Sequence, residues 1–129
     1  MRGDGFFRAG AISAFVAVLA GAFAAHALRA RLDAGALAVF ATGARYQMYH
    51  AFALFVVSWA ARRCPPSRAA HWAGWLFVVG TVLFSGSLYL LALSGARWLG
   101  AITPVGGVAF LLGWLALAIA SWPEPTAAA

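Results

Sequence analysis

The sequence predicts an all-α protein, an integral membrane bundle of four transmembrane helices. Apolar residues make up 64% of the 129-residue chain and charged residues 9%, whereas an average soluble domain carries about 25% charged residues. The apolar residues gather in four stretches, each close to the roughly 20 residues that a helix needs to cross a bilayer. We expect a single domain of residues 1–122 and a disordered tail at 123–129, with spans at residues 9–28, 42–61, 72–93 and 98–120.

The first span follows Arg2 and Arg8 and ends on Ala25-His26-Ala27. Basic residues, an apolar run and an A-x-A triplet are also the marks of a cleavable signal peptide. The apolar run here is longer than the usual run of about 7–15 residues in such a peptide. We therefore expect the first span to remain on the protein as a transmembrane helix.

Small residues mark the faces along which the predicted helices pack. In the first span, every fourth residue is small, namely Ser13, Ala17, Gly21 and Ala25. Such a stripe lets two helix backbones approach closely in lipid, where no hydrophobic effect drives helices together. We expect similar flat contacts from glycines of the third and fourth spans, which are Gly74, Gly80, Gly86, Gly106, Gly107 and Gly113.

The second helix is expected to begin before its apolar run, because Asp33 is a suitable N-cap. The residues that follow are amphipathic, which indicates a helix that starts in the interface and turns or continues into the membrane. Pro65-Pro66 ends this helix, since proline has no amide hydrogen to extend it. Cys64 lies in the same link and, as the only cysteine, forms no intramolecular disulfide.

The third and fourth spans are joined by only Ser94-Gly95-Ala96, so we expect them to be antiparallel neighbours. Pro104 lies in the first turns of the fourth helix. There it is either tolerated near the first helical position or breaks the helix locally.

Tryptophan and arginine mark the ends of the spans. Tryptophan prefers membrane–water interfaces, and of the tryptophans only Trp114 lies well inside a predicted span. The net charge of +6 includes no lysine, and the arginines lie at span ends, where they suit anionic lipid headgroups rather than nucleic acid. By the positive-inside rule, the distribution of arginine favours cytoplasmic termini by a single charge.

The polar residues within the spans are expected to share one half of the bilayer. Successive helices alternate in direction, so the end of one span and the start of the next lie on the same side. The sequence therefore predicts one polar pocket in one leaflet, near Arg45 and Tyr89, with the candidate residues His26, Gln47, His50, Ser85, Ser87 and Thr103.

Three interpretations of this pocket stay open at the level of sequence. The residues form an interhelical hydrogen-bond network, in which each bond contributes about 0.6 kcal/mol on average. Alternatively, they bind a small solute, a quinone or a lipid headgroup, because ionisable groups within a membrane are usually functional. The third interpretation is a haem or metal pair of His26 and His50, although their depths differ by about 9 Å at 1.5 Å per residue. No cysteine or carboxylate lies nearby to complete a zinc site, so we predict no metal and no cofactor.

The residue types present do not favour catalysis. The acids lie at helix ends, in links or in the tail, and are Asp4, Asp33 and Glu124. No pair of carboxylates is therefore placed to act as acid and base. A dyad of His50 with a serine of the third span would lack an acid to orient it. We predict no catalytic residues.

Several blocks of the sequence, in order, resemble one known family. They are GAFAAHAL at 21–28, YQMYH at 46–50, GWLF at 74–77, LFSGSLY at 83–89 and WLGAITPVGG at 98–107. Together with the surrounding residues 5–122, they are similar to the small four-helix membrane proteins of the YgdD/YwdK type, whose domain has no known function. The resemblance implies a bacterial inner-membrane protein with an uncleaved N-terminus. It points to the residues of the polar pocket and to Pro104, and it supplies no reaction.

The sequence thus predicts a small polytopic inner-membrane protein of unknown biochemical activity, which we expect to act as an accessory or scaffold subunit. The alternative is a membrane binding protein or transporter for a small solute, a lipid headgroup or a quinone. The expected partners are the lipid bilayer and either another membrane protein or further copies of this chain.

Overall fold

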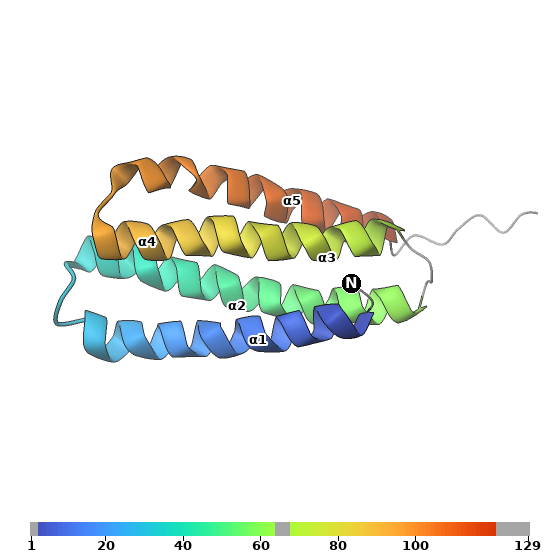
Figure 1. Ribbon diagram of the computed structural model, residues 1–129, viewed down its shortest axis with the longest axis horizontal. Helices are drawn as coiled ribbons and strands as arrows, with labels where there is room; N and C mark the ends of the chain where they lie inside the picture. Colours follow the sequence, from blue (N-terminus) through green and yellow to red (C-terminus); the bar gives the residue numbers. More distant parts are fainter. Residues whose placement is uncertain (1–2, 64–67, 121–129) are drawn as a thin grey trace, which may run out of the picture.

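The computed structural model describes residues 3–63 and 68–120, which form four helical rods lying side by side and contain no strand (Figure 1). The first rod is α1 (Gly3–Phe23), continued by the π-helical turn η1 (Ala24–Leu28), and the second is α2 (Ala34–Arg63). The third combines α3 (Arg68–Gly80), the π-helical turn η2 (Thr81–Ser85) and α4 (Gly86–Ser94). The fourth consists of the 3-10 turn η3 (Arg97–Ala101) and α5 (Thr103–Ala120).

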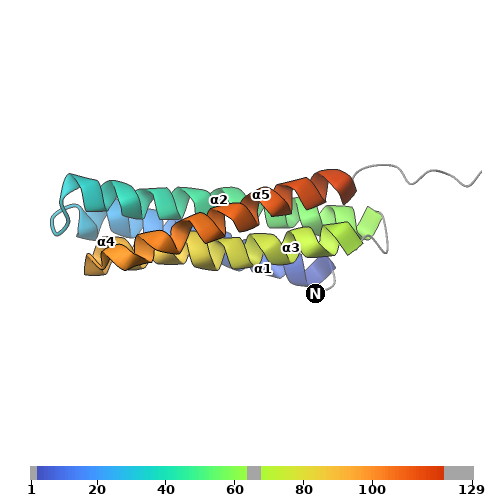
Figure 2. The same ribbon diagram turned by 90° about the horizontal axis from the view of Figure 1, so that it is seen from above.

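The rods are arranged as two antiparallel pairs. α1 packs along α2, and α5 packs along α3 and η2. α2 joins the pairs, because it also contacts α3, η2 and α4. Figure 2 shows α5 running obliquely over the third rod. The larger apolar core lies where the pairs meet, around Phe6, Leu54, Val57, Phe77 and Phe110.

The rods are longer than the spans expected from sequence. The first begins at Gly3, before the expected span at residue 9, and the third at Arg68, before residue 72, whereas the second begins at Ala34, directly after the expected cap at Asp33. The expected spans marked only the apolar part of each helix. Helical backbone hydrogen bonds continue into the polar turns that flank each apolar run, so the helices are longer than the runs that hydropathy marks.

Two expected helix-end features are confirmed. Asp33 caps α2, since its Oδ1 accepts a hydrogen bond of 2.8 Å from the amide of Ala36, and α2 then continues without a break into its apolar part. Gly95 ends α4 with φ of 71°, a left-handed conformation that favours glycine. The third and fourth rods therefore turn back tightly on each other, as expected (Figure 1).

Pro104 combines both alternatives that the sequence left open. It is the second residue of α5, where its missing amide hydrogen costs no helical hydrogen bond. The fourth rod is nevertheless irregular just before it, because η3 is a 3-10 turn rather than α-helix.

Three of the four rods are long and apolar enough to cross a membrane, namely Gly3–Leu28, Arg68–Ser94 and Arg97–Ala120. Their outward faces carry large apolar side chains, such as Ile12, Phe15 and Leu111, that are 64%, 65% and 71% exposed. α2 is not among the three, because it contains more polar residues than the other rods. Two of these residues, Gln47 and His50, are buried inside the structure.

The expected helix stop at Pro65-Pro66, the thiol of Cys64, the interfacial Trp122 and the disordered tail at 123–129 lie outside the described residues.

Glycines set the closest approaches between the rods. A Cβ atom on Gly106 would lie 2.4 Å from the backbone nitrogen of Phe84. The backbones of α5 and η2 are therefore in direct contact at this point. Gly74 and Gly113 each make room for a phenylalanine ring, Phe6 and Phe77 respectively. The flat contact expected at Gly86 is wrong, because nothing lies within 4 Å of an added Cβ there.

The neighbouring glycines Gly106 and Gly107 provide a matched test of this packing. We expect Gly106→Ala to lower the free energy of unfolding by about 1–3 kcal/mol, the usual cost of overpacking, because the backbone of Phe84 has no room to move aside. Gly107→Ala is the control, since its Cβ would meet only the Phe84 ring at an ordinary 3.8 Å. Thermal unfolding in mild detergent measures both, and equal melting temperatures for the two variants would contradict the close approach.

Candidate functional site

Most of the polar side chains expected to form the pocket lie where α2 meets the third and fourth rods. Gln47 and His50 are buried on α2, and Ser85 and Ser87 are buried on η2 and α4. Thr103 is half-buried at the start of α5. His26 is exposed, because Ala24 and Leu28 supply the buried face of η1 and His26 lies midway between them. In the part of the chain that the structure describes, His26 joins none of the hydrogen bonds of the group.

Gln47 ties three helices together. Its Nε2 donates to the backbone oxygen of Ser13 on α1 at 3.3 Å, and its Oε1 accepts from the hydroxyl of Tyr89 on α4 at 2.6 Å. The ring of Tyr89 reaches this position over Gly43, where a Cβ atom would lie 2.9 Å from the ring. Because both ends of the amide are paired, Gln47 fixes the register of α1, α2 and α4.

His50 joins α2 to α5. Its Nδ1 lies 2.7 Å from the backbone oxygen of Tyr46, and its Nε2 lies 3.3 Å from Nε1 of Trp114. A carbonyl only accepts and an indole N–H only donates, so Nδ1 carries the proton and the imidazole is neutral. The ring also stacks on Phe110, with the ring centroids 3.4 Å apart and the planes within 2°.

This arrangement bears on the haem and metal interpretation. Both ring nitrogens of His50 are engaged, so neither is left to bind a metal ion. His26 is exposed on η1 and makes no pair with it. Among the described residues, no group of three or more His, Cys, Asp or Glu side chains is placed to hold a metal ion.

The serines and threonines form a smaller link between the third and fourth rods. The hydroxyl of Ser87 donates to the backbone oxygen of Phe84 at 3.0 Å, so Thr103 donates to Ser87 across their 2.7 Å contact. Within the described residues, the buried hydroxyls of Ser13, Thr81 and Ser85 have no hydrogen-bond partner. The polar residues thus form three separate hydrogen-bonded links and do not converge on one cavity.

A groove that the sequence did not predict opens between α2 and α5, and we call it the aromatic groove. Its volume is about 650 Å³, within the range of small-molecule sites. Of the candidate pocket residues, only His50 lines it. The other lining residues are Tyr46, Tyr49, Phe84, Pro104, Gly107, Val108, Phe110, Leu111 and Trp114.

Two signals in the sequence point to this groove in retrospect. Tyr46, Tyr49 and His50 are spaced three and four residues apart, which places them on one helical face. Trp114 is the tryptophan that lies inside a span instead of at an interface. The polar residues of the spans give no indication of this groove, because aromatic rings form most of its wall.

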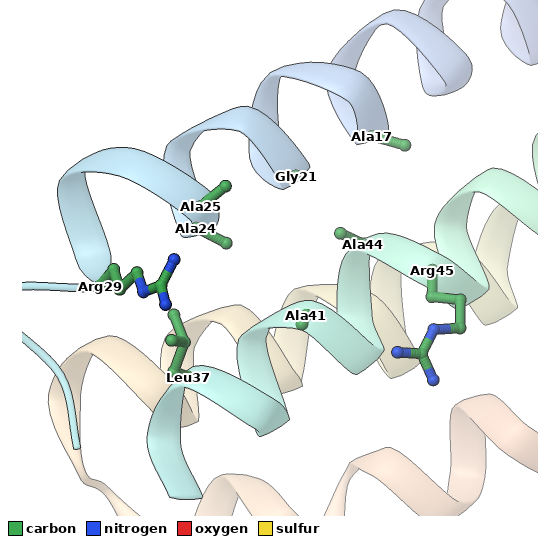
Figure 3. Close-up of a pocket in the computed structure, with 9 residues that line it drawn as sticks. All are labelled: Ala17, Gly21, Ala24, Ala25, Arg29, Leu37, Ala41, Ala44 and Arg45. Carbon is green, nitrogen blue, oxygen red and sulfur yellow. The ribbon is translucent and has the colours of Figure 1, made fainter. Parts of the chain in front are cut away.

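A second groove lies between α1 and α2, with a volume of about 570 Å³, and we call it the arginine groove (Figure 3). Small residues of the expected stripe line one wall, among them Ala17, Gly21 and Ala25. The stripe therefore does not serve only for contacts inside the molecule, since nothing lies within 4 Å of a Cβ added to Gly21. Figure 3 shows the side chain of Arg29 reaching from the end of the first rod into the gap.

The arginines of this groove, Arg29 and Arg45, have no acidic partner among the described residues. The two carboxylates of that part of the chain are already engaged. Asp4 pairs with Arg62 and fastens the start of α1 to the end of α2, and Asp33 caps α2. Arg45 lies eleven residues after Ala34, about 16 Å along α2 at 1.5 Å per residue. Both arginines are exposed, so their guanidinium groups are accessible to an anionic partner.

Comparisons with known proteins give one family and several close relatives. The family described as "Protein of unknown function (DUF423)" matches residues 20–107. The chain is 47% identical over 116 residues to the UPF0382 membrane protein YwdK of Bacillus subtilis, covering 90% of this chain and 94% of the relative. It is 44% identical over 112 residues to a UPF0382 membrane protein of Haemophilus influenzae, covering 87% and 89%. No solved structure matches the chain.

The Gln47 link predicts a measurable loss of stability. Gln47→Leu removes two hydrogen bonds and leaves the Tyr89 hydroxyl in apolar surroundings, so we expect a loss of about 1–3 kcal/mol, given bonds of roughly 0.6–1.7 kcal/mol in membranes. Adding Tyr89→Phe to this variant should recover part of the loss, because it removes the stranded hydroxyl. Reversible unfolding in mixed micelles measures both. If Gln47→Leu is as stable as the parent, the link does not hold the helices in register.

Proposed function

The chain belongs to the DUF423 family of proteins of unknown function, and on that premise we propose that it is a four-span protein of the bacterial inner membrane that acts as an accessory or scaffold subunit. The resemblance read from its sequence blocks is thereby confirmed. The finer proposal is that the arginine groove receives a transmembrane helix of a partner protein.

The position of α2 supports a fourth crossing. Its 30 residues give about 45 Å of helix at 1.5 Å per residue, more than the roughly 30 Å of hydrocarbon. It runs alongside α1 and contacts the third rod over α3, η2 and α4. Its buried polar residues are paired with other helices and so do not meet lipid. The buried polar residues of α2 are therefore covered by three more apolar rods, which accounts for its lower apolar content.

The outward position of Gly21 carries the scaffold proposal. In lipid, helices associate through small residues that let backbones approach, and an i, i+4 stripe is the pattern that does so. Most glycines of the described rods pack against a neighbouring helix, but Gly21 faces the open arginine groove. A partner helix laid along Ala17, Gly21 and Ala25 would fill this groove. A carboxylate on that helix would neutralise Arg29 or Arg45.

The four-span arrangement predicts that α2 crosses the membrane. With four spans, the link before α2 and the link after it lie on opposite sides of the membrane. Cys64, the only cysteine, reports on the second link, and Ala30→Cys in a Cys64→Ser background reports on the first. With cytoplasmic termini, a membrane-impermeant maleimide applied to intact spheroplasts should label Ala30→Cys and leave Cys64 unlabelled.

Permeabilised spheroplasts serve as the control, because both thiols should then react. If Ala30→Cys and Cys64 are both labelled from outside, or both protected, α2 does not cross the membrane. Labelling of Cys64 alone would keep four spans and reverse the orientation.

The scaffold proposal predicts that filling the arginine groove removes the partner. Gly21→Leu places a branched side chain in the arginine groove, at a position where an added Cβ meets nothing within 4 Å. We expect this variant to lose its partner and to migrate on a native gel, after extraction in mild detergent, as a smaller species than the parent.

Gly86→Leu is the matched control, because its added side chain also meets nothing within 4 Å and lies on the third rod, away from the groove. It should migrate as the parent does. Unchanged migration of Gly21→Leu would remove the basis of the scaffold proposal.

A further inference from the structure

The aromatic groove is a rigid feature built from several contacts. Its floor is the stacked pair of His50 and Phe110, and Trp114 holds His50 in place through the hydrogen bond to Nε2. Tyr46 packs on Phe84 with ring centroids 4.8 Å apart. The rings of α2, η2 and α5 thus hold one another, and the groove does not depend on a mobile segment for its shape.

The groove also carries two hydrogen-bond donors without a partner. The chain has three tyrosines. The hydroxyl of Tyr89 is paired with Gln47, whereas the hydroxyls of Tyr46 and Tyr49 form no hydrogen bond within residues 3–63 and 68–120. Both side chains are exposed along the groove, Tyr46 at 38% and Tyr49 at 53%.

The depth of these tyrosines makes their free hydroxyls significant. Tyr49 lies at the middle of the 30-residue α2, and Tyr46 is one helical turn away. Tyrosine in a membrane protein normally places its hydroxyl at the water interface. The significance of these hydroxyls rests on the proposed crossing of α2. Near the middle of a crossing helix there is no water, and an unpaired hydroxyl in an apolar medium costs free energy.

We propose that the aromatic groove binds a small, flat ring compound that is dissolved in the membrane and bears carbonyl oxygens, the chemical class of the quinones. The ring lies against the aromatic wall of the groove, and its carbonyl oxygens accept hydrogen bonds from the hydroxyls of Tyr46 and Tyr49. His50 and Phe110 form the floor, and Trp114 keeps its hydrogen bond to His50. This site goes beyond the proposed scaffold role and lies on a different surface from the arginine groove.

A lipid acyl chain does not satisfy the same observations. It would fill the groove and leave both tyrosine hydroxyls unpaired. The ester carbonyls of a phospholipid lie near the edge of the hydrocarbon, about 15 Å from the middle of a layer about 30 Å thick, too far to reach Tyr49. A ring compound that moves freely within the bilayer brings its carbonyl oxygens to this depth.

The test is a titration of the full-length protein in lipid nanodiscs with menadione (2-methyl-1,4-naphthoquinone). Binding in the groove brings the quinone to Trp114, so we expect saturable quenching of tryptophan fluorescence. The Trp114→Phe variant measures the quenching of the remaining tryptophans, of which those in the described residues do not line the groove, and should show only a linear, non-saturating response.

Three variants separate binding from partition into the lipid. The double variant Tyr46→Phe/Tyr49→Phe removes both hydroxyls and keeps both rings, so the dissociation constant should rise about tenfold, as expected for two lost hydrogen bonds. Gly107→Leu fills the groove from α5, where an added Cβ meets only ordinary contacts, and should abolish saturation. Gly21→Leu should bind as the parent does, because the arginine groove is a separate surface.

The proposal is overturned if quenching of the parent protein does not saturate, or if Gly107→Leu saturates as the parent does. It is also overturned if the double tyrosine variant binds with unchanged affinity, because the hydroxyls would then have no part in recognition. A folded state in each variant is verified by the same helical circular dichroism spectrum as the parent.

Discussion

The ring of Phe110 is the contact on which much of the rest of the structure depends. It fits between α3 and α2, because Gly80 has no side chain and a Cβ there would lie 2.5 Å from the ring. On its other face it stacks on His50 of α2. The same α5 helix also brings Trp114 to His50 and Gly106 to the backbone of Phe84. One aromatic side chain thus joins α2, α3 and α5 and closes the core between the two antiparallel pairs.

The chemistry of the surrounding lipid explains why α2 occupies the middle. Lipid supplies no hydrogen bonds, so a helix that carries glutamine and histidine has to bury them against other helices. Gln47 finds partners on α1 and α4, and His50 finds one on α5. The polar residues of α2 are thereby buried against three more apolar rods, while Tyr46, Tyr49 and Phe52 on its other side stay exposed. Average hydropathy does not record which of these side chains are hidden.

The sequence predicted the helical class, the cap at Asp33 and the tight turn at Gly95, because length, capping chemistry and glycine are local signals. The placement of Gln47, His50, Ser85, Ser87 and Thr103 in one half of the bilayer stays a prediction. The sequence did not predict that these residues would pair in three separate links, or that His26 would face outward, since side-chain direction depends on which helix face is buried. The aromatic groove was missed for the same reason, because it depends on the crossing of α5 over α2 and not on the composition of either helix.

Both grooves follow from the way in which the pairs are joined. α1 packs mainly on α2, and α5 packs mainly on α3 and η2. The contact between α2 and α5 is concentrated at a few aromatic and polar side chains, and the space beside it is the aromatic groove. Between α1 and α2 the small stripe leaves space on the outer side, and this space is the arginine groove. At Gly21 and Gly107 an added Cβ would meet nothing closer than an ordinary contact, so the two grooves reach the backbone of α1 and of α5 at these positions.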